Sequence, residues 1–317
     1  MNFPKLTSDA ILAPMAGVSD VAFRLLCKKY GAGLTCTEMI SANALARNNQ
    51  ATIKLIDVVN EEKPRMIQIF GQNTNNLIKA AKYCEDKCEI LDFNLGCPAS
   101  KIIRQGAGSA LLERPNKVKE ILEALVKTVK IPVTCKLRLG ITKNKINIIK
   151  IAQICEEAGI QMLSIHARTQ KQGYSGKADW QWIKKVKETV SIPIAGNGDV
   201  CSVEDYIKIK KETNCDYVMI GRGVIGNPYL FQQINDYNNT GKYSQRDKKQ
   251  QIKDFFEYLE LAEKYNINFN NIKFHAQAFT KGIPGSSQFR NKLSKLKNIK
   301  DVREEMKNFN DKNSPKL

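Results

Sequence analysis

The sequence predicts an α/β protein in which a (β/α)₈ TIM barrel is followed by a small all-α helical domain. Eight short runs of β-branched or aliphatic residues recur along roughly the first 220 residues, and longer segments of helical period separate them. Such alternation indicates right-handed crossovers and a parallel sheet, and eight units in this length fit a closed barrel better than an open sheet. From about residue 243 the runs stop, and only amphipathic helical segments follow.

The predicted strands occupy residues 10–17, 33–39, 65–71, 90–96, 133–140, 161–168, 192–199 and 216–223. The clearest predicted helices between them cover residues 19–31, 73–86, 116–129, 144–159 and 202–213. Each of these helical segments opens with Ser or Asn, which are favoured N-caps, and Gly31 and Gly159 occupy C-cap positions.

We predict two domains, a catalytic barrel over residues 1–240 and a helical domain over residues 241–317, reached through a polar linker at 235–243. The net charge of +18 and the pI near 9.4 favour a polyanionic partner. A generally lysine-rich composition would give the same excess. However, residues 240–317 hold 17 Lys and Arg against 9 Asp and Glu, so the charge is concentrated at the C-terminal quarter. The helical domain is therefore the predicted nucleic-acid-binding part.

Several classes of protein are excluded by composition. No stretch approaches the roughly 20 apolar residues of a membrane span, and the first residues lack the pattern of a signal peptide. The nine cysteines are odd in number and scattered, which favours reduced thiols, and Cys84 and Cys88 lack a second pair of metal ligands. We expect a cytoplasmic protein without a metal site, membrane contact or implied protein partner.

Residues at the ends of the seventh and eighth predicted strands indicate a phosphate site. Gly196–Asp199 closes the seventh strand, and Gly221, Arg222 and Gly223 close the eighth. These two loops commonly hold phosphate in barrels, because glycines let backbone N–H groups approach the oxygens and an arginine adds charge. Ordinary turn glycines would explain one such loop, but two on consecutive strands favour the phosphate site.

Other strand ends supply groups suited to a flat heterocycle. The segment "APMAG" offers a close backbone approach, while Gln68, Lys136 and His166 add an amide, a cation and an imidazole. A lysine at the mouth of a barrel can stabilise negative charge on a reduced isoalloxazine. One ring and one phosphate together predict FMN as the cofactor.

Cys97 follows the fourth predicted strand, in "DFNLGCPASKIIRQGAGSALL" (residues 92–112), between Gly96 and Pro98. A thiol fixed at a strand end can deliver a proton, and an unperturbed thiol with a pKa of about 8.5 is mostly protonated at neutral pH. The interpretation as an inert buried thiol suits Cys27, Cys155 and Cys215 better. Cys97 is therefore a candidate proton donor.

These segments resemble the tRNA-dihydrouridine synthases. The resemblance rests on "APMAGVSDVAFR", "TEM", "QIFG", the Cys97 segment, "KLRLG", "IHARTQKQGYSGKADW", "NGDV" and "GRGVIGNPYLF", and it covers residues 10–235. A weaker similarity over residues 273–290 extends to the helical tRNA-binding domain of that family. The family often has Trp-Tyr where this chain has Ala278 and Phe279.

The resemblance implies reduction of the C5–C6 double bond of particular uridines in tRNA. In the family, NADPH (or NADH) reduces FMN, hydride passes to C6, and a cysteine, here Cys97, protonates C5. The expected cofactor-binding residues are Pro14, Met15, Ala16, Gln68, Lys136, His166, Asn197, Gly198, Asp199, Gly221 and Arg222. The expected substrate-binding residues are Asn94, Arg168, Lys281 and Arg290.

Two alternatives differ in class from this prediction. An FMN-dependent barrel oxidoreductase could act on a small dihydropyrimidine-type substrate, but the basic helical tail argues against it. A catalytically inactive RNA-binding barrel would not need Cys97, Lys136 or the phosphate loops. We also expect from the sequence that a chain ending near residue 240 keeps the flavin and binds tRNA more weakly.

Overall fold

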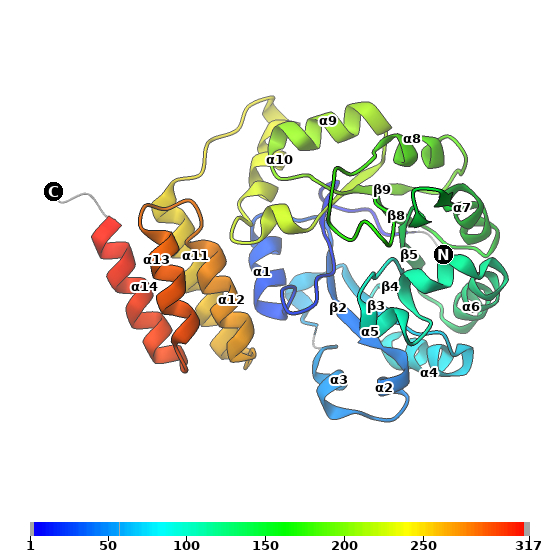
Figure 1. Cartoon of the computed structure of the whole chain (residues 1–317), viewed down its shortest axis with the longest axis horizontal. Coiled ribbons are helices and arrows are strands. Elements are labelled where there is room, and N and C mark those ends of the chain that lie inside the picture. The colour runs from blue at the N-terminus through cyan, green and yellow to red at the C-terminus, as the bar shows by residue number, and fades with distance from the viewer. Residues whose placement is uncertain (1–2, 57, 314–317) are drawn as a thin grey trace.

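The computed structural model describes residues 3–56 and 58–313, and it forms a parallel barrel with a helical unit at one side (Figure 1). Its sheet has eight strands in the order β1-β10-β9-β8-β5-β4-β3-β2, and all pairs within it are parallel. The strands are β1 (Ala10–Leu12), β2 (Thr35–Ser41), β3 (Arg65–Phe70), β4 (Ile90–Leu95), β5 (Val133–Arg138), β8 (Leu163–His166), β9 (Ile194–Asn197) and β10 (Tyr217–Ile220). The predicted fold class is confirmed, with a strand in each of the eight predicted runs.

The two end strands of this order, β1 and β2, close the barrel. The Leu12 N–H donates to the carbonyl of Leu34, and the Gly33 N–H donates to the carbonyl of Ala10, both at 2.9 Å. This seam is bridged in the sequence by α1 (Val21–Lys29), which connects β1 to β2.

Helices alternate with the strands and cover the outside of the barrel (Figure 1). After α1 the longer ones are α4 (Thr74–Cys84), α6 (Pro115–Thr128), α7 (Ile148–Glu157), α8 (Gln181–Lys187), α9 (Val203–Thr213) and α10 (Leu230–Thr240). The shorter elements are α2 (Ala42–Leu45), α3 (Gln50–Lys54), α5 (Ser100–Ile103) and the hairpin of β6 (Gly140–Thr142) and β7 (Lys145–Ile146). Side-chain N-caps such as Asp20, Asn73 and Ser202 start three of the longer helices.

Two details differ from the sequence prediction. Helix α7 begins at Ile148 because Lys145–Ile146 pairs with β6. The predicted linker at 235–243 is wrong for its first six residues, which complete α10. Their polar side chains are anchored to the barrel, since Asn235 Nδ2 donates to the carbonyl of Gly31 and Asn238 Nδ2 donates to Tyr206 Oη, both at 2.9 Å.

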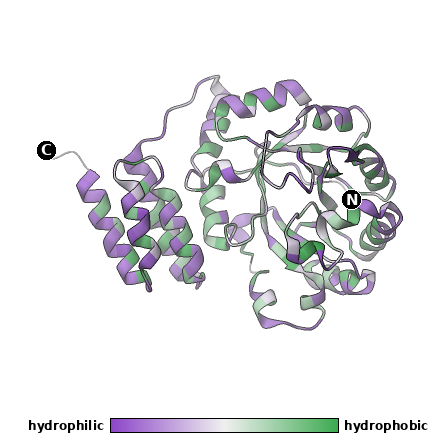
Figure 2. Ribbon diagram, viewed as in Figure 1, coloured by the Kyte–Doolittle hydropathy of each residue, from purple (hydrophilic) through white to green (hydrophobic). Residues whose placement is uncertain are grey.

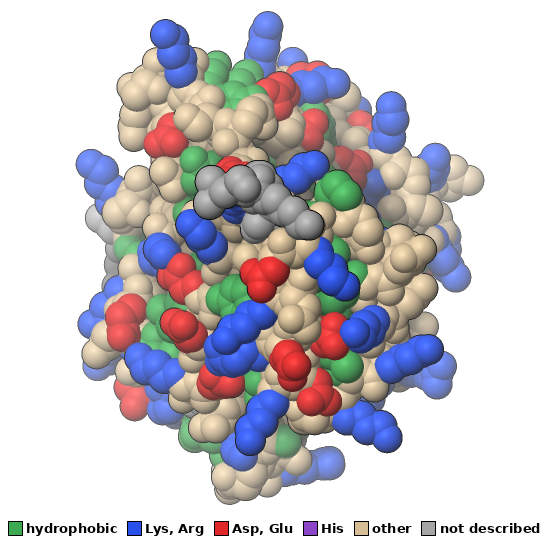
Figure 3. Space-filling model, turned by 90° about the vertical axis from the view of Figure 1, so that its left-hand side faces the viewer, with side chains coloured by type: hydrophobic (Ala, Val, Ile, Leu, Met, Phe, Trp, Pro, Cys, Tyr) green, Lys and Arg blue, Asp and Glu red, His purple; other side chains and the backbone are tan. Residues whose placement is uncertain are grey.

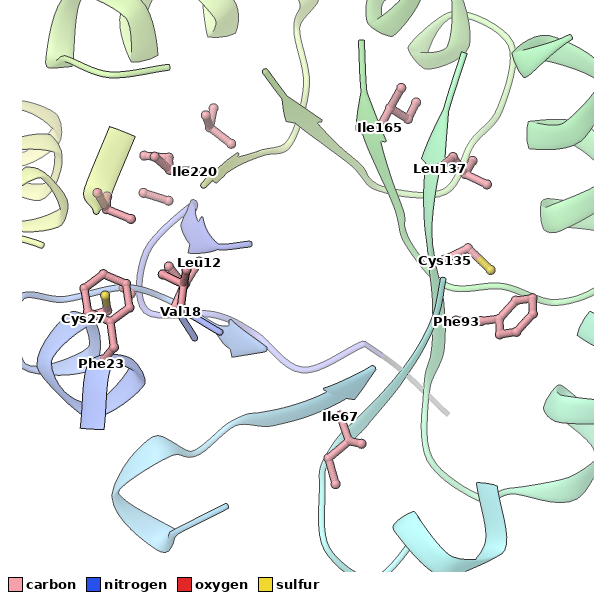
Figure 4. Packing of buried hydrophobic residues seen from close by; sticks show 14 of the residues in the cluster. Leu12, Val18, Phe23, Cys27, Ile67, Phe93, Cys135, Leu137, Ile165 and Ile220 are labelled. Carbon is pink, nitrogen blue, oxygen red and sulfur yellow. The ribbon is translucent and has the colours of Figure 1, made fainter. Parts of the chain in front are cut away.

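The alternation of side chains along each strand sorts the core into two parts. Outward residues such as Phe93, Leu137 and Ile165 join the main hydrophobic cluster beneath the helices (Figure 4). Inward residues at the amino-terminal end form a separate apolar cluster that includes Ile11, Met66, Ile90, Met162 and Met219. Further along the strands the inward positions become polar, so the interior of the barrel is apolar at the amino-terminal ends of the strands and polar at their carboxyl ends.

The helical unit consists of α11 (Lys248–Lys264), α12 (Phe269–Phe279), α13 (Ser286–Lys295) and α14 (Ile299–Asn313). Its helices are amphipathic, with hydrophilic residues prominent on the outer faces in Figure 2. Phe255, Tyr258 and Phe279 are completely buried, and α11 packs against α1 of the barrel.

Three polar contacts fasten this unit to the loop between β1 and α1. Tyr258 Oη donates to Asp20 Oδ2 at 3.0 Å, Asn271 Nδ2 lies 3.5 Å from the same oxygen, and His275 Nε2 lies 3.0 Å from the carbonyl oxygen of Val18. The His275 ring also packs against Phe23, with centroids 4.7 Å apart. The β1–α1 loop is therefore held from outside the barrel. Among the described residues, no helix is both long enough and apolar enough to cross a bilayer.

Candidate active site

The candidate site lies at the carboxyl ends of the strands, where inward side chains of neighbouring strands meet. Strand register places Gln68 beside Asp92, Asn94 beside Lys136, Arg138 beside His166, and His166 beside Asn197. These are the polar inward positions described above. The structure thus brings the predicted Gln68, Asn94, Lys136, His166 and Asn197 into one mouth.

The amino-terminal side of the Cys97 loop is fixed by Asn94. The Oδ1 atom of Asn94 accepts hydrogen bonds from the N–H groups of Gly96, at 3.1 Å, and Cys97, at 2.9 Å. Its Nδ2 atom donates to Gln68 Oε1 at 2.8 Å, and Gln68 Nε2 donates to Asp92 Oδ2 at 2.6 Å. Asp92 Oδ1 in turn accepts from Thr134 Oγ1 at 2.5 Å. A continuous buried chain therefore leads from Thr134 to the backbone of Cys97.

The other side of the loop is fixed by Ser109. The carbonyl of Cys97 accepts from the N–H of Ser109 at 3.1 Å and from its hydroxyl at 2.7 Å. A Cβ atom at Gly108, whose φ is +60°, would stand 2.9 Å from this same carbonyl oxygen, so a side chain there would displace the loop. The Cys97 side chain is partly exposed, and burial raises its pKa above the ordinary thiol value. The thiol is therefore protonated at neutral pH.

The surroundings lower the pKa of both Lys136 and His166, but the two side chains differ in charge at neutral pH. Burial, with the charge of Arg138 as a second cause, lowers the pKa of Lys136 to about 8, so the amine is still charged at neutral pH. Its Nζ atom donates to Asn197 Oδ1 at 3.3 Å. Burial and the neighbouring cations push the pKa of His166 far below its usual value, so the imidazole is neutral.

Three arginines give the mouth a strong positive charge. Arg168 donates to Asp199 Oδ2 at 2.8 Å, and Arg222 lies 3.4 Å from Asp199 Oδ1. Arg138 donates to two backbone carbonyls of the loop after β8. The ring of Tyr174, which is 59% exposed, has the guanidinium groups of Arg138 and Arg222 at 5.6 and 4.6 Å from its centroid. One carboxylate therefore serves two of these three cations.

The two predicted phosphate loops lie against each other. A Cβ atom at Gly223 would stand 2.2 Å from the carbonyl oxygen of Val200, so the loop after β10 touches the loop after β9. Gly198 has a φ of +128°, and Asp199 has a φ of +57° that places its carboxylate under Arg168 and Arg222. Gly196, by contrast, lies within β9 and faces the helix layer. An exposed arginine beside glycine backbone fits a phosphate group, and so do the cations around it.

The segment after β1 lies at the edge of the mouth. Pro14 and Met15 are partly exposed and Ala16 is exposed. A Cβ atom at Gly221 would stand 3.5 Å from Met15 Sδ, which brings this segment next to the β10 loop. The three residues are therefore on the same rim as Gly221 and Arg222, as expected for parts of one binding site.

The two predicted RNA contacts of the helical unit lie in different surroundings. Lys281 is exposed just after α12, and its charge acts with that of Arg222 on the Cys201 thiol, against the dominant effect of burial, which raises that pKa. A Cβ atom at Gly226, in the segment after β10, would stand 2.4 Å from the carbonyl oxygen of Ala278, so the end of α12 that precedes Lys281 lies near the rim of the barrel. Arg290 lies on α13, partly buried, and donates to Ser286 Oγ at 2.9 Å. Phe279, at the position where the family often has Tyr, is fully buried in the helical unit.

Five residues at the site were missed by sequence reasoning, and one of them is Ser109 of the segment after Cys97. Asp92, Thr134 and Arg138 precede or follow predicted residues by two positions on the same strands, so the strand period alone would have placed them inside the barrel. Tyr174 lies in a loop, and periodicity gives no signal there.

The fold and the site define an α/β-barrel enzyme with a protonated, partly exposed thiol in the loop after β4 and a cationic mouth. The model of the family "Dihydrouridine synthase (Dus)" matches residues 11–314, and the chain belongs to this family. It is accordingly a flavin-dependent oxidoreductase, and the predicted family and enzyme class are confirmed.

Individual relatives extend this similarity over nearly the whole chain. It is 35% identical to a probable tRNA-dihydrouridine synthase of Rickettsia bellii, over 96% of this chain and 95% of the relative. It is 44% identical to tRNA-dihydrouridine synthase B of Pasteurella multocida, over 72% of this chain and 69% of the relative. Histamine dehydrogenase from Rhizobium sp. 4-9 has a similar fold, with a TM-score of 0.56 and 13% identity over 81% of this chain and 49% of that structure.

Proposed function

We propose that this protein reduces uridines in tRNA to 5,6-dihydrouridine, with FMN as cofactor, NADPH or NADH as reductant and Cys97 as proton donor. The observation that carries the proposal is the Cys97 thiol itself. It is protonated and partly exposed, and its backbone is fixed on both sides by Asn94 and Ser109. The names of the relatives, which specify tRNA, support the choice of substrate.

FMN would be held by the rim and the polar inward residues. Arg222 and the backbone of Gly198 and Gly221 would bind the phosphate, while Pro14, Met15, Ala16, Gln68 and Asn197 would line the ring. When bound, the flavin supplies the hydride that adds to C6 of the base. The charged Lys136 is suited to stabilise negative charge at the ring. The neutral His166 can accept or donate one hydrogen bond without adding charge.

Cys97 would complete the reduction by protonating C5. Addition of hydride to C6 leaves negative charge on C5 and the adjacent carbonyl, and a donor on the opposite face of the base can neutralise it. Asn94, Arg138 and Arg168 lie at the same mouth and would contact the base or its carbonyls. A uridine of folded tRNA must leave its stack to reach this depth.

The helical unit, residues 241–317, is proposed to bind the tRNA backbone, with Lys281 and Arg290 among the contacts. Its basic residues are spread over the outer face, with carboxylates among them (Figure 3). Some are paired, as in Lys292–Glu305 at 2.7 Å and Arg303–Glu263 at 2.6 Å. Lys281, near the rim, is better placed than these to meet RNA that enters the mouth.

The decisive experiment is Cys97→Ala in the full chain. Flavin content and reduction by NADPH should be nearly unchanged, because neither step needs a proton delivered to the base. Reoxidation by unmodified tRNA, followed anaerobically by stopped flow, should slow by about 10² to 10⁴. Cys201→Ala, which removes an exposed thiol, is the matched control and should behave as wild type. Wild-type reoxidation in Cys97→Ala would show that another group protonates C5.

Two further measurements test the ligands. Arg222→Ala should retain clearly less FMN while the barrel stays folded, and full occupancy would place the phosphate elsewhere. Free uridine and uridine monophosphate should reoxidise the reduced protein far more slowly than tRNA. Equal rates would favour the small-molecule oxidoreductase instead.

A further inference from the structure

Asp92 is a buried carboxylate for which the proposed reaction has no direct use. It lies inside the barrel on β4, two residues before Asn94, and is 1% exposed. Its two oxygens accept hydrogen bonds from Gln68 Nε2 and Thr134 Oγ1, as described above. We propose that Asp92 is a positioning residue that sets the polarity of the Gln68–Asn94 chain and thereby holds the Cys97 loop. This inference rests on the proposed role of Cys97.

The polarity follows from which groups can only donate and which can only accept. An ionised carboxylate only accepts, so Gln68 must direct its NH₂ group at Asp92 and its oxygen at Asn94. Asn94 must then direct its NH₂ group at Gln68, which leaves its oxygen for the N–H groups of Gly96 and Cys97. Backbone N–H groups only donate, so both ends of the chain require the same orientation of the two amides.

The charge around Asp92 is compatible with this role. Burial raises its pKa to about 6, while the bonds from Thr134 and Gln68 and the charge of Lys136 act in the opposite direction. The thiols of Cys36 and Cys135 are the other titratable groups near Asp92, and burial, the largest cause, raises the pKa of both, so they stay neutral. Asp92 is therefore ionised at neutral pH and accepts both hydrogen bonds.

The chain can be tested by exchanging the side-chain types of Asp92 and Asn94, the two residues that bond Gln68. Asn94→Asp alone directs a carboxylate at Gln68 Oε1. Gln68 must then turn over and direct its oxygen at Asp92, which leaves two acceptors face to face. Asp92→Asn in the same chain restores a fully bonded chain, because the new amide donates to the turned Gln68 and still accepts from Thr134. We therefore expect Asn94→Asp to be harmful and the double variant to recover, although residues 92 and 94 do not bond each other.

The readouts are tRNA-dependent reoxidation and alkylation of Cys97 by iodoacetamide, located by mass spectrometry with the exposed Cys201 as internal reference. Asn94→Asp should slow reoxidation roughly 10- to 100-fold, the range for an unsatisfied buried polar group, and should speed Cys97 alkylation several-fold. The double variant should recover at least about tenfold in reoxidation and return alkylation to within about twofold of wild type. Asp92→Asn alone should cost only a few-fold, because an amide can still accept from Gln68 and donate to Thr134.

Matched controls separate polarity from net charge and from folding. The first control combines Asn94→Asp with Glu38→Gln. Glu38→Gln also removes one carboxylate, but this carboxylate accepts from the Gly17 N–H and does not contact Gln68. The combination should therefore not restore reoxidation. If Asn94→Asp does not fold, Gln68→Glu tests the contact between residues 68 and 92. Gln68→Glu alone places two carboxylates face to face, whereas Gln68→Glu with Asp92→Asn does not. Absence of recovery in both pairs, or equal recovery with Glu38→Gln, would overturn the role of Asp92. Cys97 alkylation reports on the chain even if Cys97→Ala shows that another group is the proton donor.

Discussion

Two loops at the mouth of the barrel differ in whether the helical unit helps to hold them. The Cys97 loop is fixed from within, by Asn94 and Ser109, which belong to the same strand and its following segment. The β1–α1 loop, residues 13–20, is bonded to the barrel at Gly17 by Glu38 of β2, and it is also fixed from outside by Tyr258 and His275 of the helical unit. The geometry of the proton donor therefore depends on the barrel alone, whereas one wall of the proposed flavin site depends on residues about 240 positions later in the chain.

The largest expected effect comes from ending the chain at residue 240. Sequence reasoning alone suggested that such a chain keeps its flavin, but the packing predicts the opposite. The truncation exposes Phe23 and Val18 and removes the two partners of Asp20 Oδ2, Tyr258 and Asn271. We expect aggregated or flavin-free protein by size-exclusion chromatography and flavin absorbance. A monomeric truncated flavoprotein with cooperative unfolding would mean that the barrel holds the β1–α1 loop unaided.

A smaller version of the same test is His275→Ala in the full chain. The imidazole is completely buried against Phe23 and Tyr258 and bonds the Val18 carbonyl, so its loss leaves a cavity and an unpaired carbonyl. We expect the free energy of unfolding in urea to fall by about 2–4 kcal/mol, and FMN to dissociate more readily. A variant with normal stability and normal flavin affinity would contradict the importance of this contact.

A pair of single-atom deletions sharpens the comparison. Tyr258→Phe removes one hydroxyl hydrogen bond, to the Asp20 carboxylate, and Ser109→Ala removes two, to the Cys97 carbonyl and from Gln170 Nε2. A neutral hydrogen bond is worth about 0.5–1.5 kcal/mol, and one to a charged group about 1.5–3 kcal/mol. Tyr258→Phe should weaken FMN binding and leave the reoxidation rate of the loaded protein unchanged. Ser109→Ala should slow reoxidation by tRNA and leave FMN affinity unchanged. FMN affinity is measured by fluorescence titration, and the reoxidation rate by stopped flow. If both variants changed the same quantity, the two loops would not have separate roles.

The smallest expected effect is a pH dependence at Lys136, which lies outside both loops. In the folded, flavin-free protein its pKa is about 8, against an ordinary value of 10.5, so the folded state loses this proton first. The free energy of unfolding should therefore gain a rising contribution between about pH 8 and 10.5. FMN affinity should decrease modestly as pH rises through about 8, because the cation is lost. Lys136→Met should remove both dependences, and their persistence would assign them to another group.

The barrel was predictable because its signal repeats. Each predicted strand run contains a strand, and the polar residues at the strand ends meet because parallel strands end at the same edge. Gln68, Lys136 and His166 could be placed in this way. The two glycine-containing loops proposed to bind phosphate could also be located, although Gly196 is a packing residue within β9.

What sequence reasoning missed depends on pairings distant in the chain. The Asn-rich stretch at 235–240 was interpreted as a linker because nothing local shows that Asn235 and Asn238 bond the barrel. His275 and Tyr258 look like ordinary amphipathic helix residues until α11 and α12 are placed beside α1. The polarity of the chain from Asp92 to Cys97 likewise requires the register of β3, β4 and β5.

The contact between the helical unit and the β1–α1 loop affects the order of events during synthesis. Tyr258 and Asp20 are 238 residues apart, so this contact carries a high entropic cost of loop closure and forms late. A nascent chain can pair its central strands before α11 and α12 pack against α1 and the β1–α1 loop. Cofactor loading should therefore follow release of the finished chain from the ribosome, and the amides of β1 should exchange with deuterium faster than those of β4 and β5 until FMN is bound.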